Sequence, residues 1–127
     1  MEWMDIAASI AAARHCRLPV VTANVDDLTF EAPIRLGDVV LIRARVNFTG
    51  RSSMEVGIRV DRELRADGKR EHCLTGYFTF VALGADGKPT QVPPLELAND
   101  EDKRRSEDAV ARREVRLNRR SKRVRPT

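Results

Sequence analysis

The stretch that decides the fold is VLIRARVNFTGRSSMEVGIRVD, residues 40–61. In its first half, apolar side chains alternate with mostly polar ones. The apolar set is Val40, Ile42, Ala44, Val46 and Phe48, and the mostly polar set is Leu41, Arg43, Arg45, Asn47 and Thr49. The second half repeats this period from Met54 to Val60, and Gly50 separates the two halves. Because successive side chains of a strand point to opposite faces, the stretch predicts two long, half-buried strands joined by a tight turn.

Further strand signals lie on either side of this hairpin. Residues 20–25 are rich in β-branched side chains, and residues 73–83 form a long run that is apolar on both faces near its centre. Asp67-Gly68, a common turn pair, precedes the second run. We therefore expect four strands in an antiparallel sheet.

Residues 3–16 predict a helix that is apolar on most sides and rich in alanine, with Leu18-Pro19 ending it. A helix of this kind is usually buried. A curved sheet with one apolar face could wrap it. The expected fold class is α+β, an antiparallel sheet wrapped around one long buried helix.

The C-terminal region carries the positive charge of the chain. The net charge is +4, and residues 103–125 hold eleven Lys or Arg against three Asp or Glu. Residues 99–119 predict a polar helix, capped by Asn99 or Asp100. We expect two units, a sheet-and-helix domain over 1–97 and a basic helix and tail over 98–127. A charge run of this kind usually forms a solvated face.

Composition excludes several classes of protein. With 127 residues and a 42% hydrophobic content, the chain suits one folded domain. No apolar run approaches the ~20 residues that span a bilayer, and no basic leader precedes the first helix, so we expect a soluble cytoplasmic protein without membrane contact. The pairs His15-Cys16 and His72-Cys73 lack the CxxC-type spacing of zinc sites. We therefore expect reduced thiols and no metal.

Three segments carry a resemblance to a known family: WMDIAA at 3–8, DVV at 38–40 running on to GRSSMEV at 50–56, and YFTFVAL at 77–83. Together, and in this order over residues 1–97, they resemble the acyl-CoA hydrolases of the hotdog superfamily, the group with YciA-like and cytosolic brain-type enzymes. The resemblance implies a hotdog fold and hydrolysis of acyl-CoA to a free acid and CoA. It implies no cofactor, since CoA is part of the substrate. It also implies a homodimer, or a trimer of dimers, with active sites at the dimer interface.

The same resemblance implies an N-terminal truncation. Members of the family have a strand and a Gly-Gly turn directly before the helix, whereas this sequence begins at Met1 within it. On this view the first strand is missing, and the backbone donors for the oxyanion either lie upstream of Met1 or have been lost.

The resemblance also implies roles for single residues. Taken alone, Asp5 is a carboxylate that stabilises a helix N-terminus. Gly50, Arg51, Ser52 and Ser53 alone fit an ordinary hairpin turn and a CoA-contacting turn equally well. By resemblance, Asp5 is the catalytic residue, acting as general base on water or as nucleophile. The turn is then the CoA-binding segment. His72 could reach a phosphate or lie exposed at a strand edge.

Two alternatives remain open. One is a catalytically impaired hotdog remnant that still binds CoA. The other is nucleic-acid binding through RLNRRSKRVR, residues 116–125. No aromatic residues are interleaved with these basic ones, and no recognised binding motif is present, so we expect no nucleic-acid partner.

Overall fold

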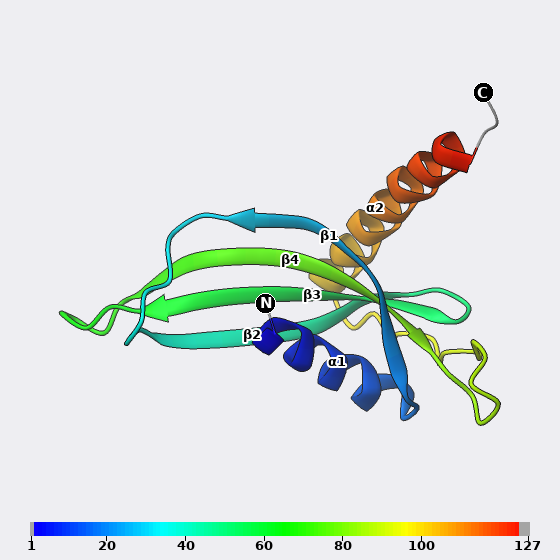
Figure 1. Cartoon of the computed structure of the whole chain (residues 1–127), viewed down its shortest axis with the longest axis horizontal. Helices are drawn as coiled ribbons and strands as arrows, with labels where there is room; N and C mark the ends of the chain where they lie inside the picture. The colour runs from blue at the N-terminus through cyan, green and yellow to red at the C-terminus, as the bar shows by residue number, and fades with distance from the viewer. Residues whose placement is uncertain (1, 125–127) are drawn as a thin grey trace.

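A computed structural model describes residues 2–124 of the chain, and the side chains of residues 3–118. Two helices and four strands follow one another in the order α1 (Glu2–Cys16), β1 (Val20–Phe30), β2 (Val39–Thr49), β3 (Ser53–Glu63), β4 (Arg70–Ala82) and α2 (Asp100–Val124). This is the expected α+β arrangement, with α1 lying along the sheet (Figure 1).

The four strands form one antiparallel sheet in the order β1-β4-β3-β2. The predicted hairpins β2–β3 and β3–β4 are confirmed, but β1 pairs with β4 rather than with its neighbour in sequence. The loop 31–38 carries the chain across to the other sheet edge (Figure 1). β1 is also longer than predicted, since it continues through Asp26 and Asp27, which are poor strand formers. The ladder is irregular there, and Asp27 has a φ of 49°.

One stripe of α1 packs on the sheet: Met4, Ala8, Ala12 and Cys16 are buried. They share a core with apolar residues of β3 and β4, namely Met54, Val56, Ile58, Val60, Cys73, Leu74, Phe78 and Phe80. The two alanines let the helix backbone approach the sheet closely. Phe78 and Phe80 of β4 thus belong to the core that faces the helix.

The remaining apolar residues of α1 are not covered by this chain. Trp3, Ile6 and Ile10 are 75%, 44% and 52% exposed. The expectation that the helix is buried on most sides is therefore wrong for the single chain. We name the surface of Trp3, Ile6 and Ile10 the outer face of α1.

A β-bulge overturns one detail of the predicted alternation. The register of β2 on β3 shifts between Val46 and Phe48, so Phe48 lies opposite Glu55. Phe48 therefore leaves the α1 side, and its ring lies 5.9 Å from the guanidinium of Arg113 on α2. Asn47, at the bulge, is buried and donates to Glu55 through Nδ2 at 3.4 Å. One extra residue in a strand moves every later side chain to the other face.

α2 packs on the face of the sheet opposite α1. Asn99 caps it as predicted, because its Oδ1 accepts the backbone N–H of Asp102 at 2.8 Å. The helix continues to Val124, beyond the predicted end at 119. Arg112 pairs with Glu55, and Arg116 donates to Asp26 at 2.8 Å. Interpreting the charge run as a solvated face is thus wrong for these two arginines.

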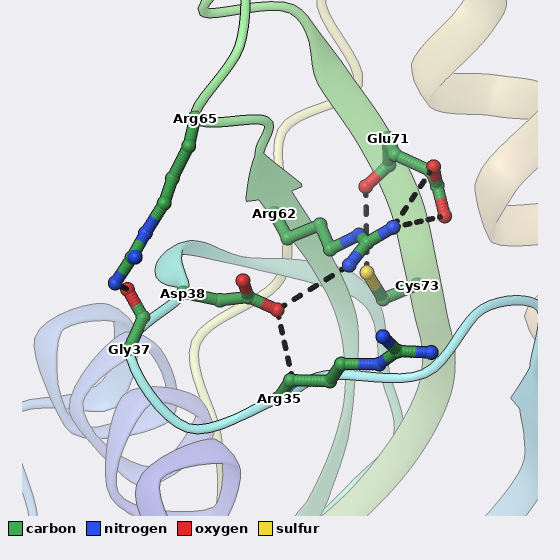
Figure 2. Close-up of polar contacts among 7 residues, drawn as sticks. All are labelled: Arg35, Gly37, Asp38, Arg62, Arg65, Glu71 and Cys73. Atoms are coloured by element: carbon green, nitrogen blue, oxygen red, sulfur yellow. Dashed lines mark hydrogen bonds and ion pairs between the residues drawn. The ribbon is translucent and has the colours of Figure 1, made fainter.

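The loop before β2 is fixed by a polar cluster (Figure 2). The carboxylate of Asp38 accepts the backbone N–H of Arg35 at 2.8 Å and Nη1 of Arg62 at 3.4 Å. Arg62 in turn donates to Glu71 of β4 at 3.3 Å. The hydrogen bond from Arg35, supported by the charge of Arg62, holds the pKa of Asp38 below its ordinary value. The cluster joins the start of β2 to β3 and β4.

Among residues 2–124, neither helix is both long and apolar enough to cross a membrane. The division into units 1–97 and 98–127 stays a prediction.

Candidate functional site

Asp5 lies near the start of α1, where a threonine of β1 fixes its carboxylate. The hydroxyl of Thr22 donates to Oδ1 of Asp5 at 2.8 Å. Both side chains are exposed, so substrate could reach the carboxylate. The sequence analysis missed Thr22, because no local pattern links residues that meet only when β1 folds back along α1.

The surroundings of Asp5 are apolar on one side. Trp3 and Ile6, its near neighbours on the outer face of α1, are exposed. The helix N-terminus favours negative charge at this position. The result is an anion beside an apolar surface, which suits a reaction at a polar group that carries an aliphatic chain.

The turn between β2 and β3 is held by backbone hydrogen bonds. Gly50 donates its N–H to the carbonyl of Ser53 at 2.8 Å. The carbonyls of Arg51 and Ser52 accept the N–H groups of Val92 and Ala82 at 2.8 and 3.0 Å. The turn is therefore rigid, while the side chain of Arg51 remains exposed.

A Cβ at Gly50 would lie 2.9 Å from Oγ of Ser53, so the absence of a side chain lets this serine fold over the turn. Polar hydroxyls, a flexible cation and accessible backbone are thus concentrated in four residues. These groups can hydrogen-bond to a phosphate or an amide, as the resemblance to acyl-CoA hydrolases implies.

Sheet register relates the two sites. Thr22 lies opposite Phe80, and Phe80 lies opposite Met54, the residue after the turn segment. Two strand spacings separate Thr22 from Met54, about 10 Å. Asp5 and the turn thus occupy the same end of the sheet. No hydrogen bond or ion pair between described side chains joins them.

His72 is not the exposed strand-edge residue that the sequence suggested. Its Nδ1 lies 3.1 Å from Oδ1 of Asp61, and its Nε2 lies 2.8 Å from Oγ1 of Thr75. Asp61 is buried and also accepts from Arg59 at 3.1 Å. These four residues form a chain of polar contacts on the α2 side of the sheet.

The two His-Cys pairs lie on different elements. Cys16 ends α1 and Cys73 lies in β4, and both are buried free thiols. Burial raises the pKa of the Cys73 thiol. His15 is held by the carbonyl of Pro93 at 2.8 Å. Within the described part of the chain, no three His, Cys, Asp or Glu residues gather as a metal site would require.

The basic segment RLNRRSKRVR, considered for nucleic acid, lies from residue 119 onward outside the described side chains. Arg116, the first residue of this segment, donates hydrogen bonds to the carboxylate of Asp26 and to the hydroxyl of Thr79, the latter at 3.0 Å.

Known proteins similar to this chain are acyl-CoA hydrolases. The chain is 42% identical over 119 residues to the uncharacterized acyl-CoA thioester hydrolase YkhA of Bacillus subtilis, covering 94% of this chain and 69% of that protein. It is 40% identical over 114 residues to the cytosolic acyl coenzyme A thioester hydrolase of Rattus norvegicus, covering 88% of this chain. The match spans only 30% of the rat protein's length.

Solved structures similar to this one are also of acyl-CoA hydrolases. An acyl-CoA hydrolase of Staphylococcus aureus, solved with butyryl coenzyme A, coenzyme A and coenzyme A disulfide, superposes with a TM-score of 0.87 at 36% identity. The superposition covers 96% of this chain and 74% of that one.

The family model of the thioesterase superfamily matches residues 1–68, which include α1, β1, β2 and β3. That range contains Asp5, Thr22 and the turn Gly50–Ser53. The hotdog fold expected from the sequence is thereby confirmed, and the chain belongs to the thioesterase superfamily.

Proposed function

We propose that the protein hydrolyses acyl-CoA thioesters to a free carboxylic acid and CoA, with Asp5 as the catalytic residue. The observation that carries the proposal is the hydrogen bond of 2.8 Å from Thr22 to the Asp5 carboxylate, at the start of a helix with an exposed apolar face. The acyl-CoA hydrolases among the relatives support the same reaction.

The spacing of Asp5 and Thr22 supports their pairing in catalysis. The S. aureus hydrolase has also been solved with an aspartate and with a threonine replaced by alanine. In that enzyme the two residues are 17 positions apart, the separation of Asp5 and Thr22 here. We therefore assign Thr22 the role of a positioning residue, which orients one carboxylate oxygen and leaves the other for the reaction.

Asp5 can act in two ways. As a general base, its carboxylate takes a proton from a water molecule that attacks the thioester carbonyl, and the CoA thiolate leaves. As a nucleophile, it attacks that carbonyl itself and displaces the CoA thiolate, and water then opens the resulting anhydride to the free acid and the Asp5 carboxylate. Single-turnover hydrolysis in heavy-oxygen water separates the routes. If Asp5 acts as a general base, the attacking water labels the product acid in the first turnover. If Asp5 acts as the nucleophile and water opens the anhydride at the Asp5 carbonyl, the first label stays in the enzyme.

The turn Gly50–Ser53 is the proposed CoA-binding segment. Arg51 is exposed and its backbone is fixed by Val92, so the guanidinium can pair with a phosphate. The serine hydroxyls can bond phosphate or pantetheine oxygens. CoA is part of the substrate, and no further cofactor is proposed.

We propose a homodimer, with further assembly of dimers into a trimer of dimers. The outer face of α1 supports the dimer, because its exposed apolar side chains stand beside the catalytic residue. A similar acyl-CoA thioesterase structure, with a TM-score of 0.88 at 35% identity, is hexameric. A cytoplasmic location is supported by the cytosolic rat relative.

The test is Asp5→Asn, assayed for free thiol release from acyl-CoA. The amide keeps an oxygen that accepts from Thr22 but loses the basic carboxylate, so kcat should fall by about 10²–10⁴-fold. Affinity for CoA, measured by calorimetry, should stay unchanged. Turnover like that of the wild type would sink the assignment of Asp5.

Matched variants sharpen this experiment. Asp27→Asn removes an exposed carboxylate from β1 and should leave kcat unchanged. Thr22→Val should lower kcat by roughly tenfold to a hundredfold with little change in KM, because it frees the Asp5 side chain to rotate. Thr22→Ser should restore most of the loss. Equal damage by the valine and serine variants would contradict a role for the hydroxyl.

A further inference from the structure

A hollow lies on the side of the sheet opposite α1. The polar faces of β2, β3 and β4, together with α2, line an open cavity of about 840 Å³. That volume is within the roughly 300–1,000 Å³ typical of small-molecule sites. Six arginines line it: Arg43, Arg45, Arg59, Arg70, Arg105 and Arg112. Only two acids, Asp61 and Asp108, share the lining, so the cavity favours an anion.

Several of these arginines already have acidic partners. Arg112 pairs with Glu55, and Arg59 pairs with Asp61 at 3.1 Å. Arg43 and Arg70, by contrast, have no hydrogen bond or ion pair through their side chains with any described residue. Two full positive charges at the cavity wall are therefore available to a ligand.

Arg105 adds an unsatisfied donor. It pairs with Glu101 at 2.6 Å through Nη2, and its buried Nη1 lies 3.7 Å from Oδ1 of Asp102 but makes no hydrogen bond with a described residue. A buried N–H group without an acceptor is costly, and most such groups in folded proteins are satisfied. An acceptor inside the cavity would remove that cost.

The sheet register sets two of the arginines against each other. Arg43 on β2 lies directly opposite Arg59 on β3, and both side chains are exposed on the same face. Like charges directly opposite each other destabilise a sheet. An anion between them turns this repulsion into a pair of attractive contacts. Asp61 already balances the charge of Arg59 at 3.1 Å, so Arg43 is the member of this pair that an anion would newly contact.

Gly57 deepens the floor of the cavity next to Arg59. It lies opposite Arg45 on one side and Tyr77 on the other. A Cβ at Gly57 would lie 2.6 Å from Nδ2 of Asn47, so the absence of a side chain lets the Asn47 amide lie over this glycine and form part of the floor.

A hydroxyl completes the lining. Thr75 lies opposite Arg59, and its Oγ1 is 2.8 Å from Nε2 of His72. His72 is held in turn by Asp61 at 3.1 Å. The threonine is therefore fixed in place and can offer a polar contact to a bound oxyanion.

The chemistry of the lining indicates phosphate. The planar guanidinium presents paired N–H donors that match phosphate oxygens. Recognition of a flat base is disfavoured, because the ring of Tyr77 is already covered by the guanidinium of Arg112 at 3.6 Å. The available arginines, Arg43 on β2 and Arg70 on β4, lie on strands two spacings apart, about 10 Å, which is wider than one phosphate group.

We propose that this cavity binds an anion with at least two linked phosphate groups, held by Arg43 and Arg70 on either side of β3. The cavity and Asp5 lie on opposite faces of the sheet, so phosphate binding here can be measured separately from turnover at Asp5. Two sources share this chemistry: a free polyphosphate or nucleotide, and the diphosphate of CoA itself.

The experiment is calorimetric titration of the full-length protein with inorganic pyrophosphate. The wild type should bind it, and Arg43→Gln and Arg70→Gln should each weaken binding by about tenfold, the loss expected for one charged phosphate contact. Arg104→Gln is the matched control, since Arg104 lies exposed on α2 outside the lining and carries the same charge. It should leave the affinity unchanged.

Further arms identify the source and separate this site from the proposed active site. Displacement of pyrophosphate by CoA, one for one, assigns the cavity to the CoA diphosphate; no displacement assigns it to a free phosphate compound. Asp5→Asn should bind pyrophosphate as the wild type does, whatever its turnover. Absence of pyrophosphate binding by the wild type overturns the proposal, as does an equal loss of affinity in Arg104→Gln.

Discussion

The two helices pack on opposite faces of one sheet, and they do so by different chemistry. α1 uses a stripe of small and apolar residues, Met4, Ala8, Ala12 and Cys16, against an apolar core. Up to residue 118, where its side chains are described, α2 has one buried apolar residue, Ala109, and it relies on Arg112 and Arg116, which reach acids of the sheet. A single sheet can therefore hold one helix by exclusion of water and another by buried charge pairs.

The ion pair of Arg112 shows what this second mode requires. Burial works against the charge, but the hydrogen bonds and charge of Glu55 outweigh it and hold the pKa of Arg112 above its ordinary value. The same guanidinium lies over the ring of Tyr77. Such a pair stabilises only while both partners are present, because either charge left alone in this place is costly.

The largest effect is expected on the α1 face. Phe80→Ala removes a ring that is fully buried in the core and should lower the free energy of unfolding by about 3–5 kcal/mol. Urea denaturation followed by circular dichroism measures this. Phe30→Ala removes an equal ring that is 72% exposed and should cost less than about 0.5 kcal/mol. Similar losses in both variants would contradict the description of this core.

An intermediate effect is expected on the α2 face. Glu55→Gln leaves Arg112 partly buried without its counter-charge and should cost about 2–3 kcal/mol, at the lower end for a buried pair because Arg112 keeps some solvent contact. The control is Glu114→Gln, an exposed acid on α2. A double-mutant cycle with Arg112→Met isolates the coupling. A coupling energy near zero would show that α2 is held in some other way.

The smallest effect concerns pH. Burial raises the pKa of Asp61, but the hydrogen bonds and charges of His72 and Arg59 outweigh it, so its pKa lies below the ordinary 3.8. A lowered pKa in the folded state means that the charged form stabilises the fold. That stabilisation is complete above the unfolded-state pKa and is lost as the pH falls through the folded one.

Asp61→Asn should therefore be less stable than the wild type at neutral pH by about 1 kcal/mol. The difference should shrink as the pH falls below 3.8. Denaturation curves over a pH series measure it, with Asp27→Asn as the exposed control. A difference that does not change with pH would contradict the role of charge.

The same comparison explains what could be predicted from the sequence. The α1 face follows local rules, so the strand period and the alanine-rich helix identified it. The α2 face depends on partners far apart in the chain, such as Arg116 and Asp26, and local patterns do not link them. Phe48 was placed on the wrong face because a one-residue bulge at Asn47 leaves no compositional signal.

The candidate site divides in the same way. Asp5 was found through a family resemblance, since helix-end chemistry alone gives it a structural role. Thr22 was missed, because its partnership with Asp5 requires that β1 run back beside α1. The arginine cavity was missed as well, because it requires β2, β3, β4 and α2 to meet on one face.

The outer face of α1 has a spectroscopic consequence. Trp3 is the only tryptophan of the chain, and it is 75% exposed two residues before Asp5. Its indole emission therefore reports on one place, the rim of the proposed active site, without a background from other tryptophans. The wavelength of that emission distinguishes a water-covered helix from one covered by a second subunit or an acyl chain, so assembly and substrate binding can be followed without a label.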